Sequence, residues 1–177
     1  MVQNEIERKF LIDRLPQGLL AGAAATRIRQ GYLLIEAERE LRLRQRGSQF
    51  WLTEKQGQGL KRLEQEVPLD AIAFEMLWPL TVGRRLEKTR HLVMHGDLCL
   101  EFDIFSAELS PLILLEVEFT SVAASRDFNL PAYVAREVTE DPAYKNARLA
   151  LCGLPKSFRL KTTLKTVKHS KRHATDH

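Results

Sequence analysis

Hydrophobic and polar residues alternate along much of the first 120 residues of the chain. Alternation with a period of two predicts β-strands, because successive side chains of a strand point to opposite faces of a sheet. In the segment 40–46, leucines occupy one face and Arg42, Arg44 and Arg46 occupy the other. The pattern predicts strands at residues 3–12, 28–35, 40–46, 49–56, 60–69, 83–94, 98–105 and 112–120. Turn residues between these runs, such as Gly47-Ser48, indicate antiparallel hairpins.

Helical patterns are fewer, and most of them lie in the last third of the chain. Helices are predicted at residues 70–80, 131–138, 143–151 and, in a basic segment, 157–167. Asp70 is a suitable N-cap for the first of these, and Pro79 predicts an early or distorted end. Pro131 stands near the first turn of the second, where proline is favourable. The segment 17–26 is compatible with either a short helix or a loop.

Length and composition predict one soluble globular domain with a tail. A chain of 177 residues with 44% hydrophobic and 28% charged residues can bury one well-packed core. We expect the domain to span residues 1–155, and a basic extension, a helix followed by a mobile tail, to span 156–177. No segment approaches the roughly 20 apolar residues of a membrane helix, and no secretory leader is evident. Cys99 and Cys152 lack disulfide or metal-site spacing, so we expect reduced thiols in a cytoplasmic protein.

Like charges recur at neighbouring positions on one face of the predicted strands. The acids are Glu5, Glu7, Glu64, Glu66, Glu101, Asp103, Glu116 and Glu118, and the bases are Lys9, Arg42, Arg44, Lys55, Arg62, Lys88 and Arg90. Neighbouring like charges repel, so a purely structural sheet gains nothing from them. Two architectures remain open. In one, a sandwich or sheet turns these faces to solvent; in the other, a closed barrel turns them inward around a hydrated tunnel.

The charge doublets suit a site that binds a divalent metal and a polyphosphate together. Mg²⁺ and Mn²⁺ take carboxylate oxygens as ligands, and the arginine fork matches phosphate oxygens bidentately. Charges without partners are costly in a dry interior. An inward-facing arrangement should therefore hold water, with acids gathered on one side and bases on the other. The formal net charge of +4 adds little to this picture, because much of the basic excess lies after Lys156.

The ordered set of motifs resembles the CYTH superfamily, also called the triphosphate tunnel metalloenzymes. The motifs run from about residue 3 to about residue 154 and are Glu5-x-Glu7-x-Lys9, Ile28-x-Gln-Gly-Tyr-Leu, Arg42-x-Arg44, Thr53-x-Lys55, Glu64-x-Glu66, Lys88-x-Arg90, Glu101-x-Asp103-x-Phe105, Glu116-x-Glu118 and Asp141-Pro-x-Tyr144. The chain looks most like the short bacterial members. The resemblance implies an α+β, mainly β fold, an eight-stranded antiparallel closed barrel with a charged interior and flanking helices. It also implies metal-dependent hydrolysis of inorganic tripolyphosphate.

The resemblance further implies roles for individual residues. Metal ligands would be Glu5, Glu7, Glu116 and Glu118, with Glu64, Glu66 and Asp103 as additional acids for Mg²⁺ or Mn²⁺. Substrate would be bound by Arg42, Arg44, Lys55, Arg62, Lys88 and Arg90. Lys9 and Tyr32 resemble the catalytic pair of bacterial tripolyphosphatases, and because both side chains titrate near pH 10, such a pair would favour alkaline conditions. We expect Glu101 to face the tunnel mouth as a solvated charge, apart from the core set of site residues.

Alternatives exist at three levels. An adenylate cyclase or a thiamine triphosphatase of the same superfamily is the nearest enzymatic alternative, although no added aromatic-rich motif for a nucleoside or thiazolium is evident. A non-catalytic polyphosphate- or RNA-binding module would use the basic tail. For single residues, the structural alternatives are a packed aromatic at Tyr32 and a surface residue at Arg62. Family analogy favours a homodimer, and no membrane partner is expected.

Overall fold

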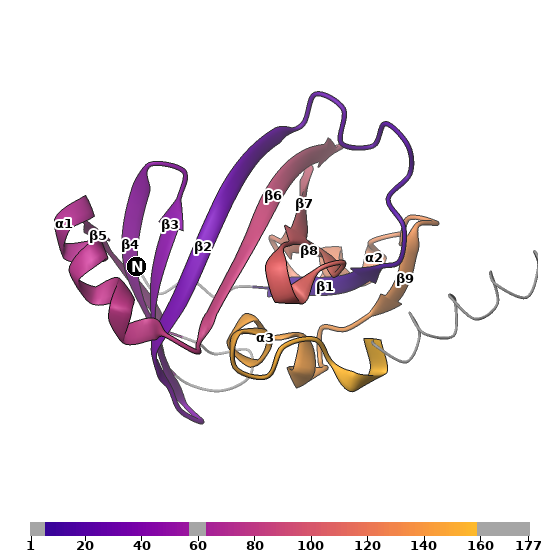
Figure 1. Ribbon diagram of the computed structural model, residues 1–177. Coiled ribbons are helices and arrows are strands. Elements are labelled where there is room, and N and C mark those ends of the chain that lie inside the picture. The colour runs from indigo at the N-terminus through magenta and orange to yellow at the C-terminus, as the bar shows by residue number, and fades with distance from the viewer. Residues whose placement is uncertain (1–5, 57–62, 159–177) are drawn as a thin grey trace, which may run out of the picture.

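The computed structural model describes residues 6–56 and 63–158, and within them nine strands form one antiparallel sheet (Figure 1). The strands are β1 (Ile6–Ile12), β2 (Ala24–Ile35), β3 (Arg39–Arg46), β4 (Gln49–Gln56), β5 (Leu63–Leu69), β6 (Arg85–His95), β7 (Leu98–Phe105), β8 (Ile113–Phe119) and β9 (Val134–Glu137). Their order across the sheet is β5-β4-β3-β2-β6-β7-β8-β1-β9. The α-helices are α1 (Ala71–Leu77), α2 (Val122–Asp127) and α3 (Asn146–Cys152), and the 3-10 helices are η1 (Trp78–Thr81), η2 (Ala107–Leu109) and η3 (Pro142–Tyr144).

The strands predicted from the alternation are all present in the described residues. Residues 3–5 of the first predicted strand and residues 60–62 of the fifth predicted strand lie outside the described part of the chain. Two-residue turns join β3 to β4 and β6 to β7, which confirms the hairpins predicted from the turn residues. Gly47 and Gly96 adopt φ values of 60° and 61° in these turns, a conformation that glycine adopts without steric cost.

The predicted eight-stranded closed barrel is wrong. The described strands form an open sheet of nine, in which β5 and β9 are the two edges and do not pair with each other. β5 is suited to an edge, because Glu66, Val67 and Pro68 are exposed and proline has no N–H to donate to a further strand. Alternation could not reveal this, since it specifies which face a side chain takes in open and closed sheets alike.

The ninth strand lies where a helix was predicted at 131–138, so that prediction is also wrong. Pro131 begins a turn, closed by a 3.0 Å hydrogen bond from the Val134 backbone N–H to the Pro131 carbonyl. The chain then pairs with β1, and the Val138 N–H donates to the Lys9 carbonyl at 2.8 Å. The free edge of β1 therefore supplies hydrogen bonds that override a weak local helix signal.

The structure contains helices in two other segments where they were predicted. The Asp70 carboxylate accepts a hydrogen bond from the Ala73 N–H at 2.7 Å, which confirms the predicted N-cap of α1. The predicted helix at 143–151 corresponds to η3 followed by α3. The undecided segment 17–26 forms turns and then enters β2, and α2 was not predicted. Of the predicted basic helix at 157–167, only residues 157 and 158 are described.

Two hydrophobic clusters lie on opposite faces of the sheet. We call the face that carries Lys9, Lys88 and Arg44 the inner face, and the other the outer face. On the outer face, Ile6 and Phe10 pack beneath α2 and the residue that ends it, Phe128. The inner-face cluster buries the following residues at one end of the sheet: Leu11, Leu86, Phe105 and Leu114 from the strands, with Leu112, Tyr144, Leu149 and Phe158.

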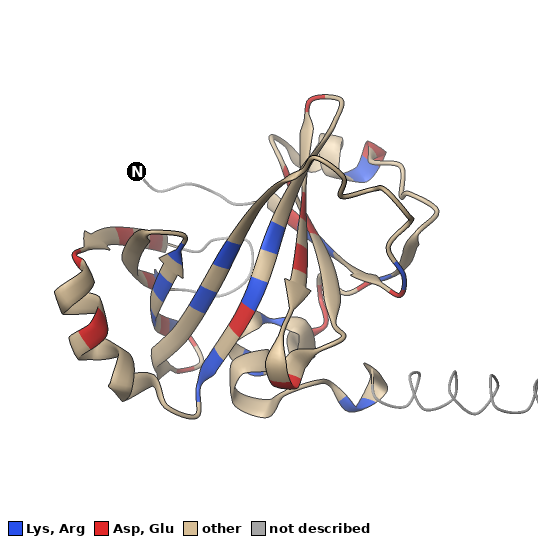
Figure 2. Cartoon of the chain, turned by 45° about the horizontal axis from the view of Figure 1, so that its top comes forward, with Lys and Arg blue, Asp and Glu red and all other residues tan. Residues whose placement is uncertain are grey.

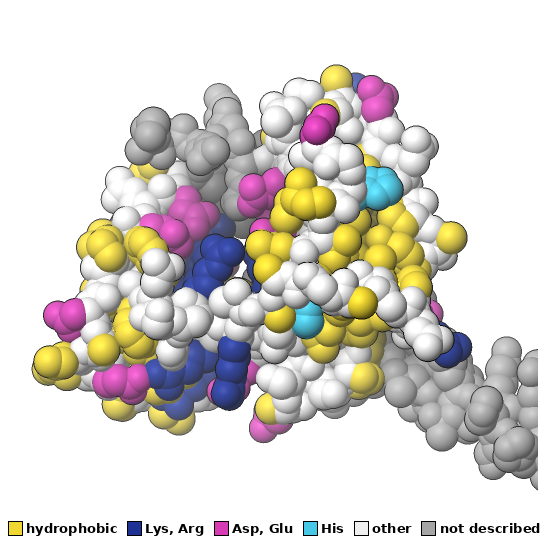
Figure 3. Space-filling view, turned by 90° about the horizontal axis from the view of Figure 1, so that it is seen from above, with side chains coloured by type: hydrophobic (Ala, Val, Ile, Leu, Met, Phe, Trp, Pro, Cys, Tyr) yellow, Lys and Arg dark blue, Asp and Glu magenta, His cyan; other side chains and the backbone are white. Residues whose placement is uncertain are grey.

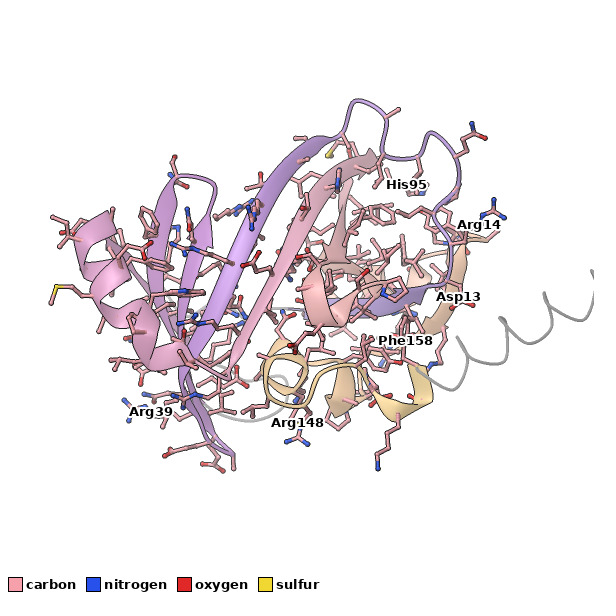
Figure 4. The ribbon with its side chains drawn as sticks, in the orientation of Figure 1. Asp13, Arg14, Arg39, His95, Arg148 and Phe158 are labelled. Carbon is pink, nitrogen blue, oxygen red and sulfur yellow. The ribbon has the colours of Figure 1, made fainter. Side chains whose placement is uncertain are left out.

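This inner-face cluster places α3 against β2 and β6 (Figure 1). One end of the inner face is thus apolar and filled, which leaves the remainder for charged side chains. The segment predicted as a helix at 143–151 therefore packs on the inner face. Phe158 points toward the sheet from the end of the described chain (Figure 4).

The outer face of β2 and β4 is covered by α1 and η1. Phe74 of α1 stacks on Trp78 at 5.2 Å between ring centroids and contacts Phe50 of β4. Gly31 of β2 allows η1 to approach closely, because a Cβ at this position would lie 2.5 Å from the Thr81 Oγ1. Among the described residues, no helix has the length and apolar character needed to cross a membrane.

Candidate active site

Strand register brings the predicted charged residues to the inner face. Lys9 lies opposite Glu116, and Glu7 lies opposite Glu118, on the adjacent strands β1 and β8. The inner face also carries Tyr32, Arg42, Arg44, Lys55, Glu64, Glu66, Lys88, Arg90 and Asp103. Basic and acidic residues accordingly band the neighbouring strands β6 and β7 (Figure 2). The predicted site residues Glu5 and Arg62 lie outside the described residues.

The half of the face formed by β1, β6, β7 and β8 pairs each cation with carboxylates. The Lys9 ammonium lies 2.9 Å from Glu116 and 3.3 Å from Glu7. The Arg90 guanidinium donates to Asp103 at 2.6 and 2.7 Å and to Glu116 at 2.5 Å. It also donates to Glu101. Arg90 is therefore surrounded by three carboxylates, and its donors are largely occupied.

Asp103 is the most enclosed carboxylate of this half. Its side chain has 0% exposure, and its neighbour Lys88 has 3%. One oxygen accepts from Arg90 alone, and the other accepts from both Arg90 and the Lys88 ammonium. A carboxylate whose two oxygens are both occupied by cations has little capacity left for a metal ion. Asp103 thus serves in this structure as the common partner of Lys88 and Arg90.

Burial and charge shift the pKa values of this network in opposite directions. Burial disfavours the charged form of Glu116, but Lys9, Lys88 and Arg90 outweigh it and hold the pKa of Glu116 well below its usual range. Burial likewise opposes the charge of Lys9, but Glu116 and Glu7 raise the Lys9 pKa above its ordinary value. Both side chains are therefore charged at neutral pH.

The half formed by β3, β4 and β5 is paired more loosely. Arg42 lies 3.1 Å from Glu64, and Lys55 lies 2.5 Å from the other oxygen of Glu64. Glu66 accepts a 2.8 Å hydrogen bond from Thr53. Arg44 reaches Glu66 only at 3.7 Å.

Two arginines of this half retain capacity to bind an anion. Arg42 is 5% exposed, and its Nε has no hydrogen-bond partner among the described residues. Burial, together with the positive charges of Arg42 and Arg90, lowers the pKa of Arg44 to about 10. An anion would supply the missing acceptor and relieve this repulsion. In the space-filling view, dark blue basic side chains lie in a hollow at the middle of the molecule, beside magenta acidic ones (Figure 3).

Tyr32 and Lys9, the predicted catalytic pair, have separate partners. Tyr32 Oη accepts a 2.6 Å hydrogen bond from the Gln30 amide, whereas Lys9 contacts Glu7 and Glu116. Their strands are separated by β6, β7 and β8 in the sheet, so the two side chains share the inner face without being neighbours on it. Burial raises the pKa of Tyr32 to about 12, and Tyr32 is therefore a phenol at neutral pH.

Two inner-face residues were not among the predicted site residues. The alternation placed Glu101 on the face of Asp103, but it was expected to be a solvated charge at the tunnel mouth; it lies opposite Glu116 and contacts Arg90. Gln30 shares the face of Tyr32, but an uncharged side chain belongs to no charge doublet and so carries no such signal.

The donor set on β1 and β8 fits a hard divalent cation in kind. Glu7 and Glu118 are direct cross-strand neighbours, and carboxylate oxygens are the ligands that Mg²⁺ and Mn²⁺ prefer. In the described part of the chain, no three acidic, histidine or cysteine side chains are gathered closely enough to hold a metal ion. Glu116 is instead engaged by Lys9 and Arg90.

The chain is similar in sequence to two inorganic triphosphatases. The chain is 49% identical over 151 residues to an inorganic triphosphatase of Nitrosomonas europaea, which covers 84% of the chain and 97% of that protein. It is 32% identical over 149 residues to an inorganic triphosphatase of Acetivibrio thermocellus, covering 82% and 92% respectively. The family models compared with the chain give no match.

A solved structure agrees with these relatives. The crystal structure of the inorganic triphosphatase NE1496 aligns with a TM-score of 0.68 and 46% identity, covering 88% of this chain and 99% of that one. The likeness therefore extends over almost the whole described region, including the strands that carry the inner-face charges.

Proposed function

The chain belongs to the inorganic triphosphatases of the CYTH superfamily, and on that premise we propose that it hydrolyses inorganic tripolyphosphate on the inner face of its open sheet. The chain spans nearly the full length of both relatives named inorganic triphosphatase. Hydrolysis of a phosphoanhydride bond needs cations to neutralise the substrate and a water molecule to attack phosphorus. The inner face offers basic and acidic groups for both purposes.

The observation that carries this proposal is the unfulfilled binding capacity of Arg42 and Arg44. A buried guanidinium N–H without a partner costs free energy, and a phosphate oxygen would satisfy it. Lys55 shares Glu64 with Arg42 and would add a third cation. Arg90 has three carboxylate partners already, so we assign initial contact with the substrate to the β3–β4 side of the face.

We assign metal binding to the cross-strand neighbours Glu7 and Glu118, with Glu5 as a further ligand predicted from sequence. Glu116 would join them by exchanging Lys9 and Arg90, which occupy its two oxygens in this structure. A bound Mg²⁺ or Mn²⁺ would neutralise phosphate charge and activate water. Glu64 and Glu66, which the sequence suggested as additional acids, contact Arg42, Lys55 and Thr53 in this structure. We therefore expect these two carboxylates to orient the phosphate-binding side chains.

The predicted catalytic pair would act from two sides of the substrate. Lys9 remains an ammonium at neutral pH because Glu116 and Glu7 raise its pKa despite burial, so it would neutralise charge and not accept a proton. Tyr32 remains a phenol, since burial raises its pKa to about 12. Its hydroxyl would donate a hydrogen bond to a substrate oxygen.

Phosphate release tests this proposal. The full chain would be assayed with tripolyphosphate, ATP and thiamine triphosphate, with Mg²⁺, with Mn²⁺ and with neither. We expect metal-dependent release that is fastest from tripolyphosphate. Glu7→Gln should reduce it strongly, whereas Glu87→Gln, which removes an outer-face carboxylate paired with Arg27, should not.

Other outcomes would point elsewhere. Cyclic AMP as the main product from ATP would favour a cyclase, and preference for thiamine triphosphate would change the substrate. Absence of release from all three would leave a binding module for polyphosphate or RNA. We also propose a cytoplasmic location, which the free thiols of Cys99 and Cys152 support.

A further inference from the structure

A block of four side chains occupies the centre of the inner face. Gln30 and Tyr32 are neighbours on the same side of β2, and Arg44 and Arg42 lie directly opposite them on β3. Gln30 is 1% exposed and Tyr32 is also 1% exposed. A buried amide is costly unless its donors and acceptor find partners. The partners of Gln30 are Tyr32 and Arg44, two groups that the proposed reaction would use.

The chemistry of arginine fixes the orientation of the Gln30 amide. Arg44 Nε contacts the Gln30 oxygen at 3.4 Å, and a guanidinium donates but does not accept hydrogen bonds. The oxygen of the amide must therefore face Arg44. The amide NH₂ then faces Tyr32 Oη, at 2.6 Å, and the phenolic oxygen acts as the acceptor.

Arg42 lies directly opposite Tyr32 on β3 and adds positive charge near the phenol. Burial raises the pKa of Tyr32, and the Arg42 guanidinium acts against that rise. Because Gln30 donates to the phenolic oxygen, the phenolic proton is directed away from the amide. The Gln30 donor and the Arg42 charge both stabilise negative charge on that oxygen.

We propose that Gln30 is a positioning residue that aims the Tyr32 hydroxyl proton at the bound substrate and links this hydroxyl to the anion-binding Arg44. This inference rests on the proposed triphosphatase function for its catalytic meaning. Gln30 does not need to touch the substrate, because it acts through Tyr32. A purely structural role would require only packing, and the cross-strand neighbour of Gln30 on β6 is Leu86, which an apolar side chain would suit.

Fluorine NMR tests the contact without relying on activity. The chain contains three tyrosines, so uniform labelling with 3-fluorotyrosine gives three resonances, and Tyr32→Phe identifies the one from Tyr32. Fluorine lowers the phenol pKa, which brings the titration into a convenient pH range. In Gln30→Met, a similar volume without a donor, the Tyr32 resonance should move and its titration midpoint should rise by about one pH unit. The other two resonances should stay in place.

Two further variants sharpen this result. Gln30→Glu keeps the shape and the contact with Arg44, but an ionised carboxylate cannot donate to Tyr32, so the midpoint should rise again. Gln45→Met is the matched control, because Gln45 also contacts an arginine, Arg29, but lies on the outer face. An unchanged Tyr32 resonance in folded Gln30→Met and Gln30→Glu would overturn the proposal.

A double-mutant cycle tests the catalytic consequence. With tripolyphosphate as substrate, Gln30→Met should lower kcat about tenfold in the wild-type background and much less in the Tyr32→Phe background. Equal effects in both backgrounds would show that Gln30 acts independently of Tyr32 and would overturn the positioning role. If wild-type protein releases no phosphate, the proposed function fails, while the NMR result still decides whether Gln30 orients Tyr32.

Discussion

Replacing Asp103 with asparagine removes the charge that Lys88 and Arg90 share. The substitution keeps the size of the side chain, so its effect is mainly electrostatic. Asp103 is fully buried, and Lys88 has only 3% exposure. Burial lowers the pKa of Lys88 although Asp103 opposes the effect, which shows how much this ammonium depends on its carboxylate.

The expected loss of stability is large. Removing one partner of a buried ion pair costs about 3–5 kcal/mol, because the remaining charge is left uncompensated. For a chain of this size, each kcal/mol lowers Tm by about 2–4 °C. Asp103→Asn should therefore lower the midpoint of thermal unfolding by roughly 6–20 °C. Glu101 and Glu116 still contact Arg90, so Lys88 should account for most of the loss.

Urea unfolding followed by circular dichroism measures this loss directly. Asp97→Asn is the matched control, since Asp97 lies in the exposed turn of the same β6–β7 hairpin and should change stability by less than about 0.5 kcal/mol. If Asp103→Asn costs less than about 1 kcal/mol, Asp103 is not the support that the geometry indicates. Bound metal should then be examined as its partner.

Three further predictions concern other parts of the sheet. Arg44→Gln should weaken tripolyphosphate binding about tenfold or more in titration calorimetry. The control is Arg39→Gln, which removes a charge on the opposite face of β3 that points away from the sheet (Figure 4) and should leave the affinity unchanged. Equal losses of affinity in the two variants would contradict the assignment of Arg44 to substrate binding. Gly31→Ala should cost about 1–3 kcal/mol in urea unfolding, because its Cβ would overlap Thr81, and a neutral result would mean that η1 shifts freely. Because the pKa of Glu116 is depressed in the folded protein, its charge stabilises the fold above the unfolded pKa of about 4.3, and this stability is lost as pH falls through the folded pKa. Glu116→Gln should therefore flatten the dependence of the free energy of unfolding on acidic pH. An unchanged slope of that dependence would refute the role of Glu116.

The sequence indicated which face of its strand each side chain occupies, but it gave less information about which strands lie next to one another in the sheet. Alternation correctly placed Lys9, Arg44 and Asp103 on one side of the sheet, because the two-residue period of a strand is a local property. It could not show that β2 pairs with β6 or that β9 adds to β1, since these pairings join distant segments. The contact of Lys9 with Glu116 depends on such a distant pairing, whereas the partners of Gln30 and Asp103 lie on the same strand or on the next strand of a hairpin.

Closure of the sheet failed as a prediction for a related reason. Whether the first and last strands of a sheet meet depends on the twist accumulated over all strands and on their tilt. No single segment of the sequence determines either quantity. The short strand β9 was also wrongly predicted as a helix, because a proline such as Pro131 is common in the first turn of a helix. The local signal was weak, and the hydrogen-bonding edge of β1 decided the outcome.

The position of β1 in the sheet has a consequence for how the protein reaches its native state. β1 is the first described strand in the chain, yet it lies between β8 and β9, so that Lys9 pairs with Glu116, 107 positions later (116 − 9). Forming so distant a contact requires closing a long loop, which slows folding. During synthesis, the half of the site formed by β1, β6, β7 and β8 must therefore wait until β8 has been made, while the strands β2–β5, each of which pairs with the next one in the chain, can assemble earlier.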